Sequence, residues 1–208
     1  MSWNILTGKL PETVLVKGTE YPIRWGFRTS ILFEIMMRDK SISEEIKLER
    51  MLSMYYPSIP SDSEAAINAA LWFYNHRMRE QEKEEKGRGR TGRKKGPSYS
   101  FAQDGDYIYA SFMEQYRMDL NRIGDEELHW WEFIALFEAL NENTQMGKII
   151  YYRSVSTSGM SNEKRRHINE MKKFYALKDN VGCDMKVELA RRNARWKDYV
   201  KKRVSGSG

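Results

Sequence analysis

The sequence contains few of the residues from which disulfides and metal centres are most often built. Cys183 is the only cysteine in the 208 residues, so neither an intramolecular disulfide nor a cysteine pair for zinc or an iron–sulfur cluster can form. The three histidines, His76, His129 and His167, fall in three different predicted helices and lack metal-ligand spacing. We therefore expect reducing conditions, no metal and no cofactor.

Catalytic and nucleotide-binding motifs are also missing. There is no G-x-S-x-G and no G-x-x-x-x-G-K-[ST], and the one G-x-G-x-x-G pattern, which begins at Gly87, lies in a charged segment. Asp104-x-Asp106 lacks further oxygen ligands, so we interpret it as acidic residues at the start of a helix. His129 is interpreted as a hydrogen-bonded histidine at a helix flank, and Cys183 as an inert thiol. We expect that the protein is not an enzyme.

Long hydrophobic runs do not occur. No segment approaches the roughly 20 apolar residues needed to cross a bilayer. The first ten residues lack the basic start and apolar stretch of a secretory signal. These absences predict a cytosolic protein without a membrane-bound part.

The composition that is present favours a folded, water-soluble chain. Hydrophobic residues make up 40% and aromatic residues 12%, which is enough for one core of about a domain's size. Charged residues make up 31%, as expected for helices with solvated outer faces. The net charge of +6 comes largely from the run Lys86–Lys95 and from the residues after Ser161.

The pattern of apolar residues predicts a mainly α-helical fold with a small N-terminal β-hairpin. Two β-branched runs, 13–16 and 19–23, flank Lys17-Gly18, and Trp25 and Phe27 are expected to anchor this hairpin on the helices. The capping patterns Ser41-x-x-Glu44 and Ser61-x-x-Glu64 are expected to start two of the helices. Helical spacing predicts helices over about 27–38, 41–56, 61–78, 101–120, 128–140, 145–152, 162–177 and 184–203.

We expect one domain of seven to eight helices. Its predicted parts are the hairpin segment 1–26, a first helical part 27–82, a flexible basic loop 83–98, a second helical part 99–204 and an added Ser-Gly linker 205–208. The segment 128–140 is apolar on two sides and is therefore expected to be the central helix, or one whose second face receives a partner.

Several blocks of sequence occur in a characteristic order. They are Leu10-Pro-Glu-Thr-Val14, Glu20-Tyr-Pro-Ile23, Phe27-Arg28 to Phe33-Glu34, Ala70-Leu-Trp-Phe-Tyr74, Phe101-x-x-Asp104-x-Asp106-Tyr-Ile-Tyr-Ala110, Leu128-His-Trp-Trp-x-Phe133, Met146-Gly-Lys-Ile149, Tyr152-Arg-Ser154 and Lys173-Phe-Tyr-Ala-Leu177. In order and spacing, these blocks resemble a family of tailed-phage and prophage proteins from Gram-positive hosts. Its members are encoded just before the tape-measure protein and are regarded as tail assembly chaperones.

The resemblance implies a role in holding another protein. It implies that the chain binds the tape-measure protein, keeps it soluble and helps recruit tail-tube subunits. The expected location is the cytoplasm of the infected or lysogenic host, with no place in the mature virion. A homo-oligomer is compatible with this role, and no catalytic residues are carried over.

Methionine and aromatic side chains are the candidates for the partner-binding surface. The 12 methionines suit a surface that accepts varied apolar helices, although the same residues are equally those of an ordinary core. The hypothesised contact residues are Met36, Met37, Trp130, Trp131 and Phe137.

A small nucleic-acid-associated phage protein is the alternative interpretation. Its non-specific phosphate contacts would come from the basic loop and the C-terminal basic helix. The loop contains no aromatic residue on which a base could stack, so solvated charge is the other interpretation of the same run. The loop residues concerned are Arg88, Arg90, Arg93, Lys94 and Lys95.

Overall fold

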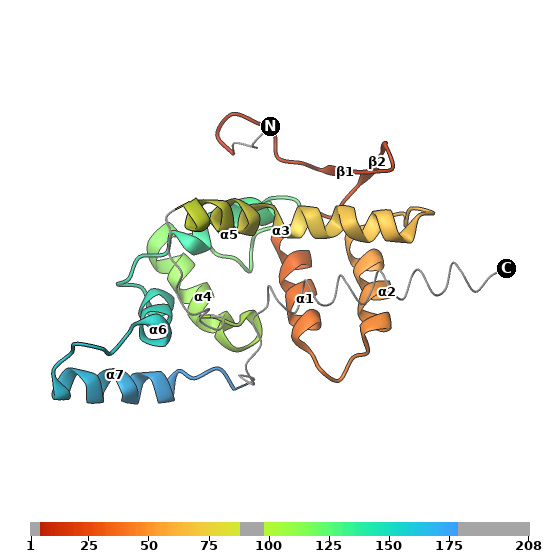
Figure 1. Ribbon diagram of the computed structural model, residues 1–208. Helices are drawn as coiled ribbons and strands as arrows, with labels where there is room; N and C mark the ends of the chain where they lie inside the picture. Colours follow the sequence, from red (N-terminus) through yellow and green to blue (C-terminus); the bar gives the residue numbers. More distant parts are fainter. Residues whose placement is uncertain (1–4, 88–97, 179–208) are drawn as a thin grey trace. The chain divides into compact units, whose positions relative to one another are not determined.

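The computed structural model describes residues 5–87 and 98–178, which form seven helices and an N-terminal two-stranded antiparallel hairpin (Figure 1). This confirms the predicted fold class. The chain groups into two compact units. Of the described residues, 5–87 and 108–140 belong to unit 1, and 98–107 and 141–178 belong to unit 2.

The hairpin of unit 1 consists of β1 (Thr13–Val16) and β2 (Thr19–Pro22). Lys17 and Gly18 both have positive φ, 50° and 83°, which is the backbone conformation of a two-residue type I′ turn. Alternation along β1 buries Val14 and Val16, and the strand packs against α3. The predicted hairpin and its turn are confirmed.

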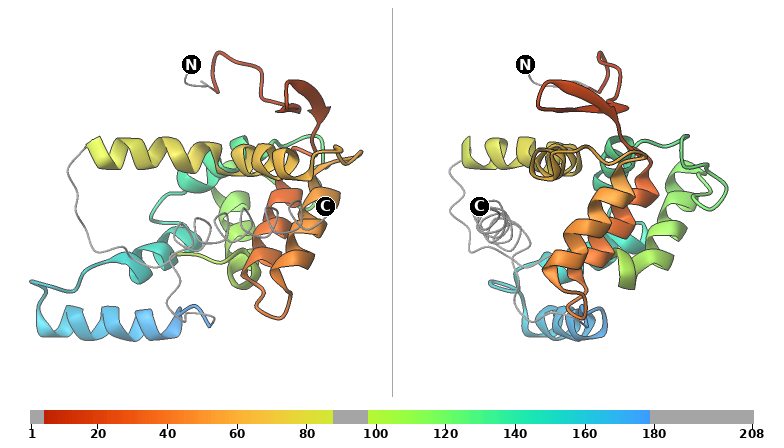
Figure 2. Two further views of the ribbon diagram at one scale, coloured as in Figure 1. Left: turned by 45° about the vertical axis from the view of Figure 1, so that its right-hand side comes forward. Right: turned by 90° about the vertical axis from the view of Figure 1, so that its right-hand side faces the viewer.

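Four helices of unit 1 surround an aromatic core. They are α1 (Phe27–Arg38), α2 (Glu44–Tyr55), α3 (Ser63–Gly87) and α5 (Trp130–Glu138), joined by the C-terminal half of α4 (Phe101–Tyr116). Figures 1 and 2 show α1 and α2 side by side and antiparallel. Phe33 packs edge-on against Tyr55 and Tyr74, with ring centroids 5.5 and 4.9 Å away.

Two helices of unit 1 are capped by residues that lie later in the sequence than the predicted caps. Ser43, not Ser41, caps α2 by accepting the amide of Ile46, while the Ser41 hydroxyl donates to Asp39. At the start of α3, the Ala65 amide donates to the Asp62 carboxylate. Both predicted capping boxes are therefore wrong, because more than one residue before each helix carries a side-chain oxygen that can accept the orphan amides.

Helix α3 extends further than its apolar pattern. It runs to Gly87, so residues 83–87 of the predicted loop are helical. The glutamates and lysines of this stretch have high helix propensity, which allows a helix without an apolar face. Residues 88–97 and the predicted helix 184–203 lie outside the described residues.

Unit 2 contains α6 (Gln145–Ser154), α7 (Asn162–Phe174) and the N-terminal half of α4. Thr144 caps α6 by accepting the Gly147 amide at 3.1 Å, and Ser161 caps α7. Met146 and Ile149 are buried from α6, whereas Ile168 is the buried residue of α7.

Candidate functional site

The hypothesised partner-binding side chains lie in the interior of unit 1. Each of the five has 9% or less of its surface exposed. They occupy α1 and α5, on the sides that face other helices. This placement agrees with the other interpretation of these side chains, namely that they form an ordinary core. The residues are Met36, Met37, Trp130, Trp131 and Phe137.

The two tryptophans hold α5 against α3. The indole N–H of Trp130 donates to the carbonyl of Tyr74 at 3.1 Å, and that of Trp131 donates to the carbonyl of Phe73 at 2.8 Å. Trp130 also stacks on the Tyr74 ring, with an interplanar angle of 9°. Since a buried indole N–H needs an acceptor, these bonds fix the register between the two helices.

An aliphatic stripe lies on the opposite side of α1 from the core. Leu32 is 58% exposed, and Ile31 and Ile35 are half-buried beside it. Positions 31, 32 and 35 share one helix side, whereas the buried side carries Phe33 and Met37. Helical spacing alone does not show which of the apolar residues of α1 face the core and which face outward. We call Ile31, Leu32 and Ile35 the α1 outer stripe.

The α1 outer stripe is continued by a positioned arginine. Arg28, one turn before Leu32, donates from Nη2 to the Leu120 carbonyl and from Nη1 to the Ile123 carbonyl, both at 2.6 Å. Its Nη1 also contacts the Asp125 carboxylate at 3.1 Å. These bonds connect α1 to the segment between α4 and α5 within unit 1.

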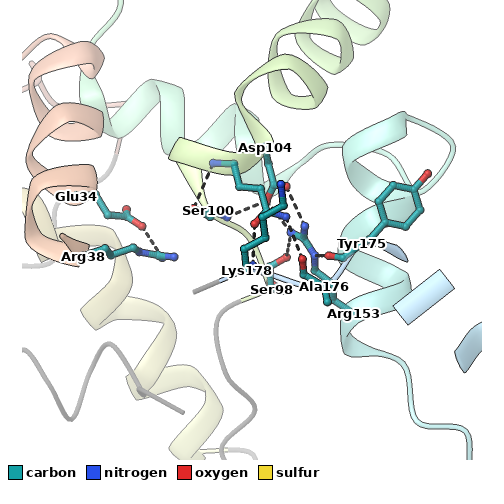
Figure 3. Close-up of polar contacts among 10 residues, drawn as sticks. Glu34, Arg38, Ser98, Ser100, Asp104, Arg153, Tyr175, Ala176 and Lys178 are labelled. Atoms are coloured by element: carbon teal, nitrogen blue, oxygen red, sulfur yellow. Dashed lines mark hydrogen bonds and ion pairs between the residues drawn. The ribbon is translucent and has the colours of Figure 1, made fainter. Parts of the chain in front are cut away.

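Glu34 is a buried carboxylate that no local pattern in the sequence indicates. Its side chain is 2% exposed, and it accepts hydrogen bonds from Arg38 Nη2 at 2.6 Å and from the Tyr74 hydroxyl at 2.8 Å. Figure 3 shows the contact with Arg38. Burial raises the pKa of Glu34 above its ordinary value, although Arg38 and Tyr74 both oppose the shift.

His129 caps α5 and takes part in two further contacts. Its Nδ1 accepts the amide of Trp131 at 3.0 Å, and its own amide donates to the Glu132 carboxylate at 3.0 Å. Its Nε2 lies 3.1 Å from the carbonyl oxygen of Pro11. Burial lowers the pKa of His129 below its ordinary value. The interpretation of His129 as a hydrogen-bonded residue at a helix flank is confirmed.

A shallow hollow of about 210 Å³ adjoins His129 in unit 1. Its charged lining groups are largely engaged locally, since Lys9 pairs with Glu12 and the Glu127 carboxylate accepts the Gly124 amide. Among residues 5–87 and 98–178, no group of three or more His, Cys, Asp or Glu side chains is arranged to hold a metal ion. The hollow is lined by Lys9, Leu10, Glu12, Trp25, Glu127, His129 and Glu132.

Unit 2 contains a buried ion pair that links its segments. Arg153 Nη1 and Nη2 donate to the two carboxylate oxygens of Asp104 at 2.6 and 2.9 Å (Figure 3). Asp104 also accepts the amide of Ser100, which agrees with its predicted place at a helix start. The role of Arg153 was not predicted, because nothing in the local sequence indicates which of the many arginines meets this aspartate.

The residues of the nucleic-acid alternative fall in the part of the chain that is not described. Arg88, Arg90, Arg93, Lys94 and Lys95 all lie between residues 88 and 97. In the described part, α7 carries five basic and two acidic side chains and has a largely exposed surface. This excess of basic residues does not by itself favour the alternative, because a solvated, charged helix face has the same composition.

A family model described as Bacteriophage Gp15 protein matches residues 6–177. The chain belongs to the Gp15 family of bacteriophage proteins. The match includes the hairpin and all seven described helices, so the Gp15 assignment concerns both units. Comparisons with curated proteins and with solved structures find no match. Within the described residues, the helices are too short or too polar to span a membrane.

Proposed function

We propose that this Gp15 protein is a tail assembly chaperone that binds the tape-measure protein, keeps it soluble and helps recruit tail-tube subunits. Membership of a bacteriophage family carries the proposal, because it limits the role to the phage cycle. A helical domain with an aliphatic stripe on its surface suits binding of an apolar helix. The role consists of binding and needs neither catalysis nor a cofactor.

The physical basis of such holding is reversible burial of apolar surface. A long helical chain with exposed apolar stripes aggregates unless those stripes are covered. A partner that covers them shifts the equilibrium toward the soluble complex by mass action, without ATP. Tube subunits that compete for the same stripes with higher affinity would then displace the chaperone.

The α1 outer stripe is the surface that we propose for this contact. Leu32 projects from a helix whose other side is anchored in the core by Phe33 and Met37, so the surface is rigid before binding. Arg28 lies on the same side of α1 and is fixed by backbone carbonyls, which supplies a polar edge. We propose the α1 outer stripe in place of the contact residues hypothesised from the sequence, which are buried in α1 and α5.

Co-expression with the tape-measure protein tests the proposal. The wild-type chain should keep the tape-measure protein in the soluble fraction and co-elute with it. Leu32→Glu places a charge in the α1 outer stripe and should abolish co-elution while leaving the fold intact. Leu15→Glu is the matched control, because Leu15 is 65% exposed on the hairpin and lies outside the stripe.

Two results would argue against the proposed function or its surface. If the tape-measure protein is equally insoluble with and without the wild-type chain, the chaperone role is wrong. If Leu32→Glu and Leu15→Glu both retain co-elution, the role stands but the α1 outer stripe is not the contact. Salt-sensitive DNA binding without any effect on the tape-measure protein would favour the nucleic-acid role instead.

A further inference from the structure

The two ring nitrogens of His129 have different hydrogen-bonding roles. Nδ1 faces the amide N–H of Trp131 and must accept, while Nε2 faces the carbonyl oxygen of Pro11 and must donate. A single protonation state satisfies both contacts, namely the neutral ring with its proton on Nε2. The geometry therefore fixes both the charge and the tautomer of a side chain that is 3% exposed.

We infer that His129 is a proton-sensitive link between the N-terminal segment and α5. The His129 link consists of the bond from Trp131 to Nδ1 and the bond from Nε2 to Pro11. A second proton would sit on Nδ1 and point at the Trp131 N–H, so two donors would face each other. The cap of α5 would therefore be lost. The Nε2 proton could still bond to the Pro11 carbonyl, but only if the charged ring stayed buried.

Charged groups around the ring and its burial have opposite effects on the pH at which His129 takes up the second proton. Glu132 and Glu12 favour the protonated ring, and burial disfavours it more strongly. Lys9 offsets Glu12, to which it is paired at 3.0 Å, and Glu127 lines the same hollow while accepting a backbone amide.

The remaining faces of the ring are covered by aromatic side chains. Trp25 stacks on the ring at 5.5 Å, and Phe73 and Trp131 meet it edge-on. None of these three side chains carries a charge. The ring is thus held in an aromatic enclosure in which a positive charge loses hydration, which favours the neutral form.

The link lies where two segments of unit 1 meet. The Trp130 amide donates to the carbonyl of Trp25 at 2.9 Å, and the Phe27 amide donates to the carbonyl of Leu128 at 3.1 Å. Protonation of His129 should therefore loosen the first turn of α5 together with the segment around Pro11. The α1–α2 pair, which has no bond to His129 among the described contacts, should respond much less.

The direction of the pH effect follows from the lowered pKa. The unfolded chain takes up the proton near the ordinary value of 6.5, and the folded chain takes it up at lower pH. The contribution of the link to stability is therefore complete above pH 6.5 and is lost as the pH falls from 6.5 through the folded-state pKa. The link is closed at neutral pH and opens on acidification.

Ring and amide NMR signals of the full chain test the inference. At pH 7.5 the wild-type His129 ring should carry its proton on Nε2, and its folded-state pKa should lie below 6.5. On acidification through the folded-state pKa of His129, measured in the same titration, Trp131 amide exchange, corrected for its intrinsic pH dependence, should speed up by roughly fivefold, the effect of losing one helix cap. A ring protonated on Nδ1 at pH 7.5, or Trp131 protection that is equal above and below the measured folded-state pKa, would overturn the inference.

Two substitutions separate the two bonds of the link. His129→Asn offers an oxygen in place of Nδ1 and cannot titrate, so the Trp131 amide should remain protected above and below the wild-type pKa of His129. His129→Gln offers a donor in place of Nε2 but no acceptor for Trp131, so protection should be reduced in both pH ranges. His167→Asn is the control, because His167 is exposed on α7 of unit 2 and should leave the Trp131 response unchanged. If His129→Asn retains the wild-type pH response, the proton does not act through His129.

Discussion

Arg153 donates two parallel hydrogen bonds to the Asp104 carboxylate, and both side chains are almost fully buried. The Arg153 side chain is 7% exposed and that of Asp104 is 0% exposed. Arg153 Nε also donates to the Tyr175 carbonyl at 2.6 Å, and Nη1 donates to the Ser98 carbonyl at 3.1 Å. One side chain on α6 thus joins the start of α4 to the chain after α7, all within unit 2.

Removal of the arginine from this pair should destabilise unit 2 strongly. Arg153→Met leaves the Asp104 carboxylate buried without its partner, which costs about 3–5 kcal/mol. Arg153→Lys should recover only part of the loss, because an ammonium cannot form the two parallel bonds. Urea unfolding at pH 7, followed by circular dichroism, measures the difference. Arg122→Met is the control, since Arg122 is 88% exposed and its pair with Asp119 should contribute about 0–1 kcal/mol.

Glu34 should make the stability of unit 1 depend on pH. Its pKa is raised from 4.5, so the folded state binds this proton more tightly than the unfolded chain does. The corresponding stabilisation is complete below pH 4.5 and is lost as the pH rises through the folded-state pKa. The free energy of unfolding of the wild type, relative to Glu34→Gln, should therefore fall by about 1.4 kcal/mol for each pH unit that separates the unfolded-state pKa from the folded-state pKa.

A second substitution checks what sets the folded-state pKa of Glu34. The Tyr74 hydroxyl lowers the pKa of Glu34 by donating to its carboxylate. Tyr74→Phe should therefore move the pH-dependent step to higher pH. If the free energy of unfolding has the same pH dependence in the wild type and in Glu34→Gln between pH 4 and 8, Glu34 does not titrate as expected.

Gly147 should be intolerant of any side chain. A Cβ at this position would lie 2.1 Å from the carbonyl oxygen of Asn141 and 3.0 Å from Cα of Glu142. Because both obstacles are backbone atoms, Gly147→Ala should shift the start of α6 and destabilise the chain by about 1–3 kcal/mol. Gly105→Ala is the matched control within α4. Nothing lies within 4 Å of its Cβ, so it should stabilise the helix by about 0.5–1 kcal/mol.

Trp131 should affect stability rather than act as a specific probe of partner binding. Trp131→Ala removes a buried ring and its bond to the Phe73 carbonyl, and should cost about 3–5 kcal/mol in urea unfolding. Leu32→Ala, on the α1 outer stripe, should change stability by no more than about 0.5 kcal/mol. Equal effects of the two substitutions on stability would contradict the assignment of core and surface.

The sequence was sufficient for the elements that are encoded by neighbouring residues. The hairpin follows from β-branched runs around Lys17-Gly18, where glycine accepts positive φ readily. The helices follow from apolar residues at helical spacing, and the placement of His129 at a helix flank follows from its position before an apolar run. Local backbone preference decides these features without any knowledge of distant residues, although it did not identify which residues cap α2 and α3.

Only the tertiary structure decided which side of each helix is buried and which distant groups meet. Periodicity shows that α1 has apolar residues, but α1 has two apolar sides, and contacts with α2 and α5 select the one that is buried. The pairs Arg153–Asp104 and Tyr74–Glu34 join residues 49 and 40 positions apart. Such pairings depend on how the helices pack, and a single sequence carries no local signal for them because many charged residues could serve equally well.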